Sequence, residues 1–303
     1  MKIDISIIIV SYNVSEYIIS CIESIYKHSS ENINFEIIVV DNNSIDDSVA
    51  QIKKLFPKVK LIENDFNHGF SKAVNKGVSE SNGNQILILN PDTLFIDNTL
   101  EKFSVAVNHN EKVGAVGALL LDENGFVQQS CWKYPTLMNT ILSIFFLDFL
   151  NIKKNYKIES FSKLTEVSTI SGAVFFMKRN LFLDTGGFNE DLFWMEDIDL
   201  CMRLRKKGYL NYFLPENKII HYSGKSSKKD YKTSILNQNL SKIKYFKIHS
   251  TARSVKVLFL AILINIFIKI LFLFFLMPFS SIYRAKINAY IQAFIKIARF
   301  QLS

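Results

Sequence analysis

One short acidic segment has the residue types that a catalytic site needs. Residues 194–200 hold three carboxylates within four positions: Glu196, Asp197 and Asp199. A glycine pair, Gly186-Gly187, precedes the segment, and His221 follows it. Carboxylates this dense beside aromatic side chains bind a cation or take a proton from a reacting hydroxyl. The segment therefore predicts a metal site or a general base.

Two more polar segments directly follow short apolar runs. They read Val39-Val40-Asp41-Asn42-Asn43-Ser44 and Leu89-Asn90-Pro91-Asp92-Thr93. Carboxylates and amides at such positions can bind a ribose, a pyrimidine imide or a cation that bridges phosphates. With the acidic segment, they outline a site that binds a nucleoside diphosphate and removes one proton from an acceptor.

The apolar runs predict the elements that position these residues. Residues 5–10, 35–40 and 85–89 are typical of buried parallel strands. Residues 15–28 and 46–56 have helical spacing, and Ser44 or Asp46 can cap the second helix. We expect an α/β fold with an open, mostly parallel, doubly wound sheet. Ligands of such sheets bind beyond the carboxyl ends of the strands, where Asp41 and Asp92 fall.

The sequence lacks the signatures of several other classes. No Gly-rich fingerprint follows the first strand, which argues against a dinucleotide-dependent dehydrogenase. A P-loop and a Gly-x-Ser-x-Gly elbow are also absent. The three cysteines are far apart and without metal spacing, so neither disulfides nor zinc are expected. The first residues do not resemble a signal peptide, and we expect a cytoplasmic protein.

Positive charge is concentrated in the C-terminal part. Residues 1–224 carry 22 Lys and Arg against 27 Asp and Glu, a net charge of −5. Residues 225–303 carry 14 against 1, a net charge of +13. The basic residues flank the most apolar stretch of the chain, which favours an anionic membrane surface over nucleic acid as the partner. No nucleic-acid ligand is expected.

The tail contains two apolar segments. Residues 257–277 are apolar except for Asn265 and Lys269, and 21 residues are long enough to span a bilayer. The two polar residues share a helical face, so a helix lying in one leaflet or packing on a partner is an equal alternative. Residues 281–302 predict a basic amphipathic helix. Its alternative role is packing on the catalytic domain or on the second subunit of a homodimer.

The middle of the chain has a weaker pattern. Residues 137–150 are apolar with few breaks, and residues 153–163 form a polar linker. This region is interpreted either as a lid or acceptor-facing insertion, or as a helix that covers the core. We place the domain boundary after residue 235, with a catalytic domain at 1–235 and a membrane-associating helical tail at 236–303.

Several motifs, in this order, resemble family 2 glycosyltransferases with the GT-A fold, in particular the rhamnosyltransferase-like branch of bacterial polysaccharide biosynthesis. The resemblance covers about residues 4–226. The motifs that carry it are Ser11-Tyr12-Asn13, Val39-Val40-Asp41-Asn42-Asn43-Ser44, Asn67-His68-Gly69-Phe70, Asn75-Lys76-Gly77, Leu89-Asn90-Pro91-Asp92, Ser171-Gly172-Ala173, Gly186-Gly187-Phe188-Asn189-Glu190, Glu196-Asp197-Ile198-Asp199-Leu200-Cys201-Met202-Arg203 and His221-Tyr222-Ser223-Gly224-Lys225-Ser226.

The resemblance implies a role for each motif. Nucleotide and donor binding would fall to ten residues: Ser11, Tyr12, Asn13, Asp41, Asn43, Asn67, Gly69, Asn75, Asn90 and Asp92. Asp92 matches the last acid of the family's Asp-x-Asp metal motif, but Asn90 stands in place of the first. His221 is the candidate second ligand for Mg²⁺ or Mn²⁺.

Asp197 matches the family's catalytic base, with Glu196 orienting the acceptor or the base. A helix at 196–205 would put Asp197 on the face of Leu200 and Cys201, turn Asp199 away and let Asp199 pair with Arg203. A single base implies inversion at the anomeric carbon, by analogy with glycoside hydrolases.

The predicted function is a membrane-associated inverting glycosyltransferase at the cytoplasmic face of the bacterial inner membrane. It would be peripheral or hold one hydrophobic tail segment. The first candidate donor is dTDP-rhamnose, and the acceptor a glycan, free or linked to polyprenyl diphosphate. Alternatives are a galactofuranosyl- or other hexosyltransferase, and an idle scaffold that only binds a nucleotide sugar. A sugar nucleotidyltransferase is a third option, but the Gly-rich basic first loop of that class is absent.

Overall fold

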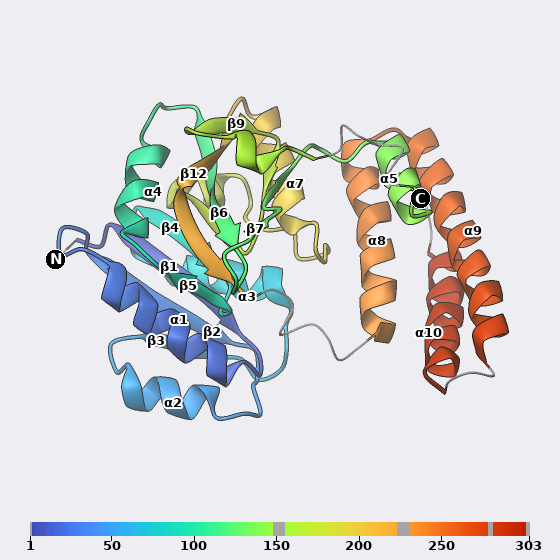
Figure 1. Cartoon of the computed structure of the whole chain (residues 1–303), viewed down its shortest axis with the longest axis horizontal. Coiled ribbons are helices and arrows are strands. Elements are labelled where there is room, and N and C mark those ends of the chain that lie inside the picture. Colours follow the sequence, from blue (N-terminus) through green and yellow to red (C-terminus); the bar gives the residue numbers. More distant parts are fainter. Residues whose placement is uncertain (1, 148–154, 223–230, 278–280, 301–303) are drawn as a thin grey trace. The chain divides into compact units, whose positions relative to one another are not determined.

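The computed structural model describes residues 2–147, 155–222, 231–277 and 281–300 (Figure 1). It divides into two units. The first, called the catalytic unit below, contains residues 1–134, 155–190 and 196–226. The second, called the helical unit, contains residues 135–154, 191–195 and 227–303. Parts of the sequence predictions lie outside the described residues: Ser223-Gly224-Lys225-Ser226, residues 148–154 of the middle region, and residues 278–280 and 301–303 of the tail.

The catalytic unit is built on one ten-stranded sheet. Its main path has the order β3-β2-β1-β4-β11-β6-β12-β5, with β7 paired to β6 and β9 to β12. A separate two-stranded sheet pairs β8 with β10. The strands are β1 Ile5–Ser11, β2 Phe35–Asp41, β3 Lys60–Glu63, β4 Gln85–Leu89, β5 Thr93–Phe95, β6 Val113–Leu121, β7 Val127–Gln128, β8 Cys131–Trp132, β9 Thr165–Val167, β10 Thr169–Ile170, β11 Val174–Lys178 and β12 Leu210–His221.

The predicted parallel strands form one side of this sheet. β3, β2, β1 and β4 run parallel, with Ser11 beside Asp41 and Ile9 beside Leu89. The carboxyl ends of β1, β2 and β4 therefore meet at one edge, as predicted from the apolar runs. β6 and β12 are also parallel, whereas β11 and β5 run antiparallel to their neighbours. The edge strand β3 is only half-buried, and the apolar pattern did not predict it.

Helices cover both faces of the sheet because its strands are apolar on both sides. The helices of this unit are α1 Ser15–His28, α2 Ser48–Leu55, α3 Phe70–Ser79, α4 Thr99–Val107, α6 Arg179–Asp184 and α7 Glu196–Lys206. Residues of α1, α2 and α4 share one buried cluster with alternate β1 side chains such as Ile7. Residues of α3, α6 and α7 share the other with Ile8. The predicted second helix begins two residues later than expected, at Ser48.

One glycine sets how closely α3 approaches the sheet. A Cβ atom at Gly77 would lie 2.6 Å from Cγ2 of Ile8 and 3.1 Å from Cγ2 of Val40. A larger residue would therefore push α3 away from β1 and β2. This close packing brings the N-terminus of α3 toward the carboxyl end of β2, where Gly69 accepts a hydrogen bond from Asn42.

The helical unit contains α5 Leu137–Ile144, α8 Tyr231–His249, α9 Ala252–Leu276 and α10 Ser281–Ala298. The last three helices run side by side (Figure 1). α5, from the middle of the chain, packs on α9 and therefore belongs with the tail helices. This contact was not predicted: the sequence suggested either a lid or a helix covering the core. A contact between residues so distant in sequence leaves no local pattern.

The two polar residues of α9 are satisfied inside this unit. Asn265 donates from Nδ2 to the carbonyl oxygen of Ile144 at 2.9 Å. The Lys269 ammonium lies 4.9 Å from the centroid of the Phe146 ring and 5.7 Å from that of Tyr290. Cation–π contacts of this kind stabilise a lysine removed from water. The polar face of α9 is thus directed at α5 and α10.

Candidate active site

The loops after β1 and β2 are held together by their own polar side chains. The backbone N–H of Asn13 donates to Ser44 Oγ at 3.0 Å, and Asn13 Oδ1 accepts from the N–H of Ile45 at 2.8 Å. Asp46 accepts from the N–H of Ser15 at 3.0 Å and so caps α1. The sequence suggested Asp46 as a cap for the following helix. Asp46 has this contact as well, because its Oδ1 accepts from the N–H and the hydroxyl of Ser48 at the start of α2.

These bonds leave an exposed surface after β1 and β2, called the ledge below, which carries three of the predicted nucleotide-binding residues. Tyr12 is 40% exposed, and Asn13 and Asn43 are exposed with φ of 54° and 65°. Asparagine tolerates this left-handed backbone better than most residues. The Ser11 hydroxyl is buried and has no hydrogen-bond partner among the described residues. A buried hydroxyl of this kind fits an additional polar ligand at the edge of the sheet.

Asp41 is buried at the end of β2 and is held by Ser44. Its Oδ2 accepts from the N–H of Ser44 at 2.8 Å, and its Oδ1 accepts from Ser44 Oγ at 2.6 Å. Each carboxylate oxygen can accept more than one hydrogen bond. Asp41 is therefore fixed in orientation and keeps lone pairs for a ligand at the ledge.

The Asn67–Gly69 turn is anchored to β2 through a chain of amides. Lys76 Nζ donates to Asn64 Oδ1 at 2.7 Å, Asn64 Nδ2 donates to Asn42 Oδ1 at 2.9 Å, and Asn42 Nδ2 donates to the Gly69 carbonyl oxygen at 3.3 Å. Asn67 Oδ1 accepts from the N–H of Gly69 at 2.9 Å within the turn. The φ of +84° at Gly69 requires glycine, although a Cβ there would meet open space.

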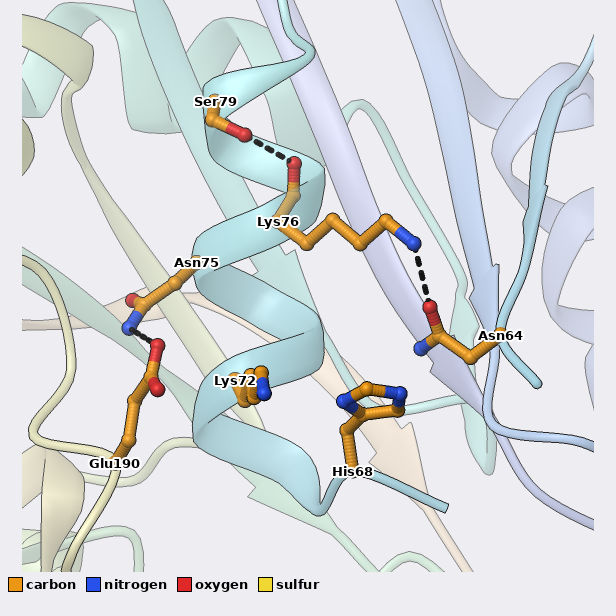
Figure 2. A pocket seen from close by; sticks show the side chains of 7 residues that line it. All are labelled: Asn64, His68, Lys72, Asn75, Lys76, Ser79 and Glu190. Carbon is orange, nitrogen blue, oxygen red and sulfur yellow. Dashed lines mark hydrogen bonds between the residues drawn. The ribbon is translucent and has the colours of Figure 1, made fainter. Parts of the chain in front are cut away.

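Asn75 has a tethering role that the sequence did not suggest. Its Nδ2 donates to the Phe188 carbonyl oxygen at 2.8 Å and to Glu190 Oε1 at 3.1 Å, and its Oδ1 accepts from the N–H of Phe188 at 2.9 Å. The amide thus ties α3 to the loop after α6. Asn75 and Glu190 also border a pocket of about 450 Å³ along α3, which is lined by polar and charged residues (Figure 2). The other residues lining the pocket are Asn64, His68, Lys72, Lys76 and Ser79.

The structure brings together the two predicted metal ligands, although they are far apart in sequence. Asp92 Oδ1 lies 3.4 Å from His221 Nε2, and both side chains are nearly buried. β5 and β12 hold the pair, because His221 is registered with Thr93 and the N–H of Tyr222 donates to the Asp92 carbonyl oxygen at 2.9 Å. The described residues contain no group of three or more acidic, His or Cys side chains that could hold a metal.

A divalent cation at this pair would therefore take its remaining ligands from a diphosphate and water. An imidazole nitrogen and a carboxylate oxygen suit Mn²⁺, and a diphosphate and water supply the oxygen ligands that Mg²⁺ also prefers. The donor set thus fits a shared cation rather than one enclosed by protein.

Asp197 stands at the first turn of α7 and faces the Ser171–Ala173 turn. Its Oδ2 accepts from the N–H of Gly172 at 2.7 Å, and its Oδ1 accepts from the N–H of Ile198 at 2.7 Å. A Cβ at residue 172 would lie 3.3 Å from that Oδ2, so glycine leaves room for the carboxyl group. Burial raises the pKa of Asp197 to about 6, with the backbone hydrogen bonds acting in the opposite direction. A carboxylate poised near neutral pH suits a general base.

The other two carboxylates of the acidic segment are more deeply buried than Asp197. Asp199 pairs with Arg203 at 2.7 Å, as predicted, but its side chain is completely buried rather than merely turned away. The guanidinium of Arg203 also donates to the carbonyl oxygens of Thr185 and Gly187. The pair therefore anchors α7 to the loop after α6. Glu196 is buried at the first residue of α7, where the helix dipole favours an acid.

One turn links Asp197, the predicted base, to the predicted metal site. The Ala173 carbonyl oxygen accepts from the N–H of Asn90 at 2.9 Å, one residue after the contact between Gly172 and Asp197. Asp197 and the Asn90-Pro91-Asp92 segment are thus fixed to neighbouring residues of the same turn. Sequence reasoning named both ends of this arrangement but not Gln128, which contacts His221. No local pattern marks Gln128, because its partner His221 is 93 residues away in the sequence.

Comparisons with known proteins identify the family of the chain. The profile described as Glycosyl transferase family 2 matches residues 6–186. N-acetylglucosaminyl-diphospho-decaprenol L-rhamnosyltransferase of Mycobacterium tuberculosis (strain CDC 1551 / Oshkosh) is 26% identical over 212 residues, 64% of this chain and 68% of the relative. Rhamnosyltransferase WbbL of Escherichia coli (strain K12) is 28% identical over 228 residues, 72% of this chain and 83% of the relative.

The fold is also found among solved structures. Mannosyltransferase PcManGT from Pyrobaculum calidifontis, in complex with GDP-Man and Mn²⁺, superposes with a TM-score of 0.57 at 17% identity, covering 99% of this chain and 88% of the other. This likeness confirms the predicted GT-A architecture. Because the family profile spans more than half of the chain, the protein is a glycosyltransferase that belongs to family 2, in the branch whose curated members include rhamnosyltransferases.

Proposed function

We propose that the protein transfers a sugar, with inversion, from a nucleoside-diphosphate donor to a glycan or polyprenyl-diphosphate-linked acceptor. The observation that carries the proposal is Asp197: a carboxylate of raised pKa, tied through one turn to the segment of Asp92. The names of the two rhamnosyltransferase relatives support rhamnose as the transferred sugar, and the name of the Mycobacterium relative supports a lipid-linked acceptor. The dTDP nucleotide is proposed from the sequence resemblance.

The residues divide into three tasks. Ser11, Tyr12, Asn13, Asp41 and Asn43 would bind the nucleoside at the ledge after β1 and β2. Asn67, Gly69 and Asn75 would line the binding site of the donor. Asn75 would do so by tethering α3. Asn90, with Asp92 and His221, would face the diphosphate, and these last two would hold Mg²⁺ or Mn²⁺. A bound cation supplies neutralisation of the charge on the departing diphosphate.

Asp197 would take the proton from the acceptor hydroxyl as that oxygen attacks the anomeric carbon. The bond between this carbon and the diphosphate oxygen breaks, and the nucleoside diphosphate leaves with the bonding electrons. One displacement from the opposite side inverts the configuration. Glu196, buried beside Asp197 in the chain, would orient the base or the acceptor.

A donor panel tests this proposal. We expect nucleoside-diphosphate release from one sugar donor, dTDP-rhamnose first, with stimulation by Mg²⁺ or Mn²⁺ and by a polyprenyl-linked acceptor. The measurement is nucleotide release together with analysis of the glycan product. Turnover of a galactofuranose or other hexose donor instead would show that dTDP-rhamnose is not the donor. Nucleotide binding without turnover on any acceptor would contradict the enzyme and favour a scaffold.

The helical unit would attach the enzyme to the cytoplasmic face of the membrane. α9 is long and apolar enough to cross a bilayer. Its polar pair, Asn265 and Lys269, already contacts Ile144, Phe146 and Tyr290. Beyond Arg253 and Lys256 near its start, its exposed side chains are apolar. We therefore propose that this apolar face lies in one leaflet. The exposed large side chains of α9 are Val257, Leu260, Ile264, Phe267, Ile268, Leu271, Phe272, Phe274 and Phe275.

Vesicle flotation tests this attachment. The double variant Phe272→Glu/Phe275→Glu should lower the bound fraction on anionic vesicles by more than about tenfold, because each buried phenyl contributes about 1.5–3 kcal/mol. The matched control is Phe126→Glu, which changes an equally exposed phenylalanine of the catalytic unit. Equal flotation of wild type and the double variant would contradict the proposal. A homodimer that dissociates in the double variant would assign the face to a second copy.

A further inference from the structure

Gln128, the last residue of β7, contacts His221 twice. Its Nε2 donates to the His221 carbonyl oxygen at 2.7 Å, and its Oε1 lies 3.1 Å from His221 Nδ1. β7 and β12 both pair with β6, which fixes the distance between the two residues. Gln128 belongs to none of the motifs recognised in the sequence.

The first contact determines how the second one must be made. A carbonyl oxygen only accepts, so the amide nitrogen of Gln128 must be the group that faces the His221 carbonyl. The amide oxygen then faces Nδ1, and an amide oxygen cannot donate. Nδ1 must therefore carry the hydrogen. In a neutral imidazole the other nitrogen, Nε2, is left with its lone pair.

This tautomer presents two acceptors to each other. The Nε2 lone pair faces Asp92 Oδ1 across 3.4 Å, and the two side chains are 12% and 5% exposed. Two electron-rich atoms held this close in a nearly dry site repel each other unless a proton or a metal cation lies between them or beside them. The opposite tautomer would place a hydrogen on Nε2 and satisfy Asp92 by an ordinary hydrogen bond.

We infer that Gln128 is a positioning residue that fixes the Nδ1-protonated tautomer of His221, and thereby turns the Asp92–His221 pair into a binding site for a divalent cation. A partner on the second imidazole nitrogen is the usual means by which proteins orient a histidine ligand. The inference rests on the metal site of the proposed function, but the tautomer itself can be measured without metal.

The neighbouring residue offers a matched control. Gln129 also donates through Nε2 to backbone carbonyl oxygens, but these belong to Cys131 and Tyr156 rather than to His221. Gln128→Leu removes both contacts with His221, whereas Gln129→Leu removes an amide of the same size one residue away. Gln128→Glu keeps an acceptor for the Nδ1 hydrogen and loses the donor to the carbonyl oxygen.

The first measurement is the ¹⁵N NMR spectrum of the imidazoles in metal-free full-length protein at about pH 8.5, where imidazole is neutral in model compounds. His221 is assigned by the loss of its signals in His221→Gln. We expect the Nδ1-protonated form in wild type, Gln129→Leu and Gln128→Glu. In Gln128→Leu we expect the Nε2-protonated form, because that hydrogen can then bond to Asp92.

The second measurement is Mn²⁺ affinity by EPR, for Mn²⁺ alone and with deoxythymidine diphosphate. Gln128→Leu should bind about 10–100-fold more weakly than wild type, and Gln129→Leu and Gln128→Glu should remain close to wild type. Thermal unfolding of each variant excludes loss of the fold as the cause.

Two results would overturn the inference. One is an Nε2-protonated His221 in wild type, and the other is a Gln128→Leu variant that keeps both the wild-type tautomer and the wild-type Mn²⁺ affinity. A wild-type protein that binds no Mn²⁺ but shows the Nδ1-protonated tautomer would refute the metal site of the proposed function. The same result would support the positioning of His221 by Gln128.

Discussion

Asp197→Asn should lower the rate of sugar transfer by about 10²–10⁴-fold, while nucleotide binding persists. The variant keeps the size of the side chain but cannot accept the proton of the acceptor hydroxyl. Nucleotide binding should survive because the loops after β1 and β2 are held by their own side chains, whereas Asp197 is bonded to Gly172 and Ile198. Transfer kinetics and calorimetric titration of the nucleoside diphosphate measure the two effects separately.

The control for this variant is Asp184→Asn, which changes an exposed carboxylate at the end of α6. It should leave transfer unchanged. If the Asp197→Asn variant keeps wild-type turnover, Asp197 is not the catalytic base and has only a structural role in the first turn of α7.

The pH dependence of the transfer rate tests the same role of Asp197 in the wild-type protein. Burial raises the pKa of Asp197 to about 6, and only the deprotonated carboxylate acts as a base. The transfer rate should therefore be full above this value and fall as the pH drops through about 6. An aspartate with its ordinary pKa near 4 would hold the rate constant down to much lower pH. A pH–rate profile without an inflection near 6 would contradict the assigned base.

Asp92→Asn should lower kcat/KM by about 100-fold or more and abolish stimulation by Mg²⁺ or Mn²⁺. Charge stabilisation by a bound cation contributes several kcal/mol to such a transition state, and an amide is a much weaker ligand than a carboxylate. The fold should survive, because the hydrogen bond from Tyr222 is accepted by the backbone of residue 92. Metal titrations of the initial rate measure the effect.

Glu123→Gln is the control, since it neutralises an exposed carboxylate in the turn that leads to β7. It should show wild-type metal activation. If the initial rate of Asp92→Asn is stimulated by metal as strongly as that of wild type, the cation is bound elsewhere. The contact between Asp92 and His221 then has only a structural role.

Local sequence patterns were sufficient to predict the elements of the parallel half of the sheet. β1, β2 and β4 repeat short apolar runs, and α1 follows a helical period, because a buried strand or a one-sided helix imposes its own spacing on the side chains. The same patterns missed β3, which lies half-buried at the edge of the sheet and is only four residues long. An edge strand buries too little to leave a continuous apolar run.

The motifs also identified Asp92 and His221 as a pair, and they located Asp199 beside Arg203. Spacing along a helix predicted the second pair, because residues four apart lie on one face. It could not predict that Asp199 is completely buried, since burial depends on the loop after α6 that closes over it.

The sequence by itself therefore predicted which residues carry the chemistry and determined which strands end beside them. Only the tertiary structure decided how those residues are held. Gln128 meets His221 from 93 positions away, Asn75 meets Phe188 from 113, and Asn265 meets the Ile144 carbonyl from 121. Such hydrogen bonds arise when the packed sheet and helices bring distant backbone groups together, and they impose no repeat on the chain. They are consequently invisible to any pattern read along the sequence.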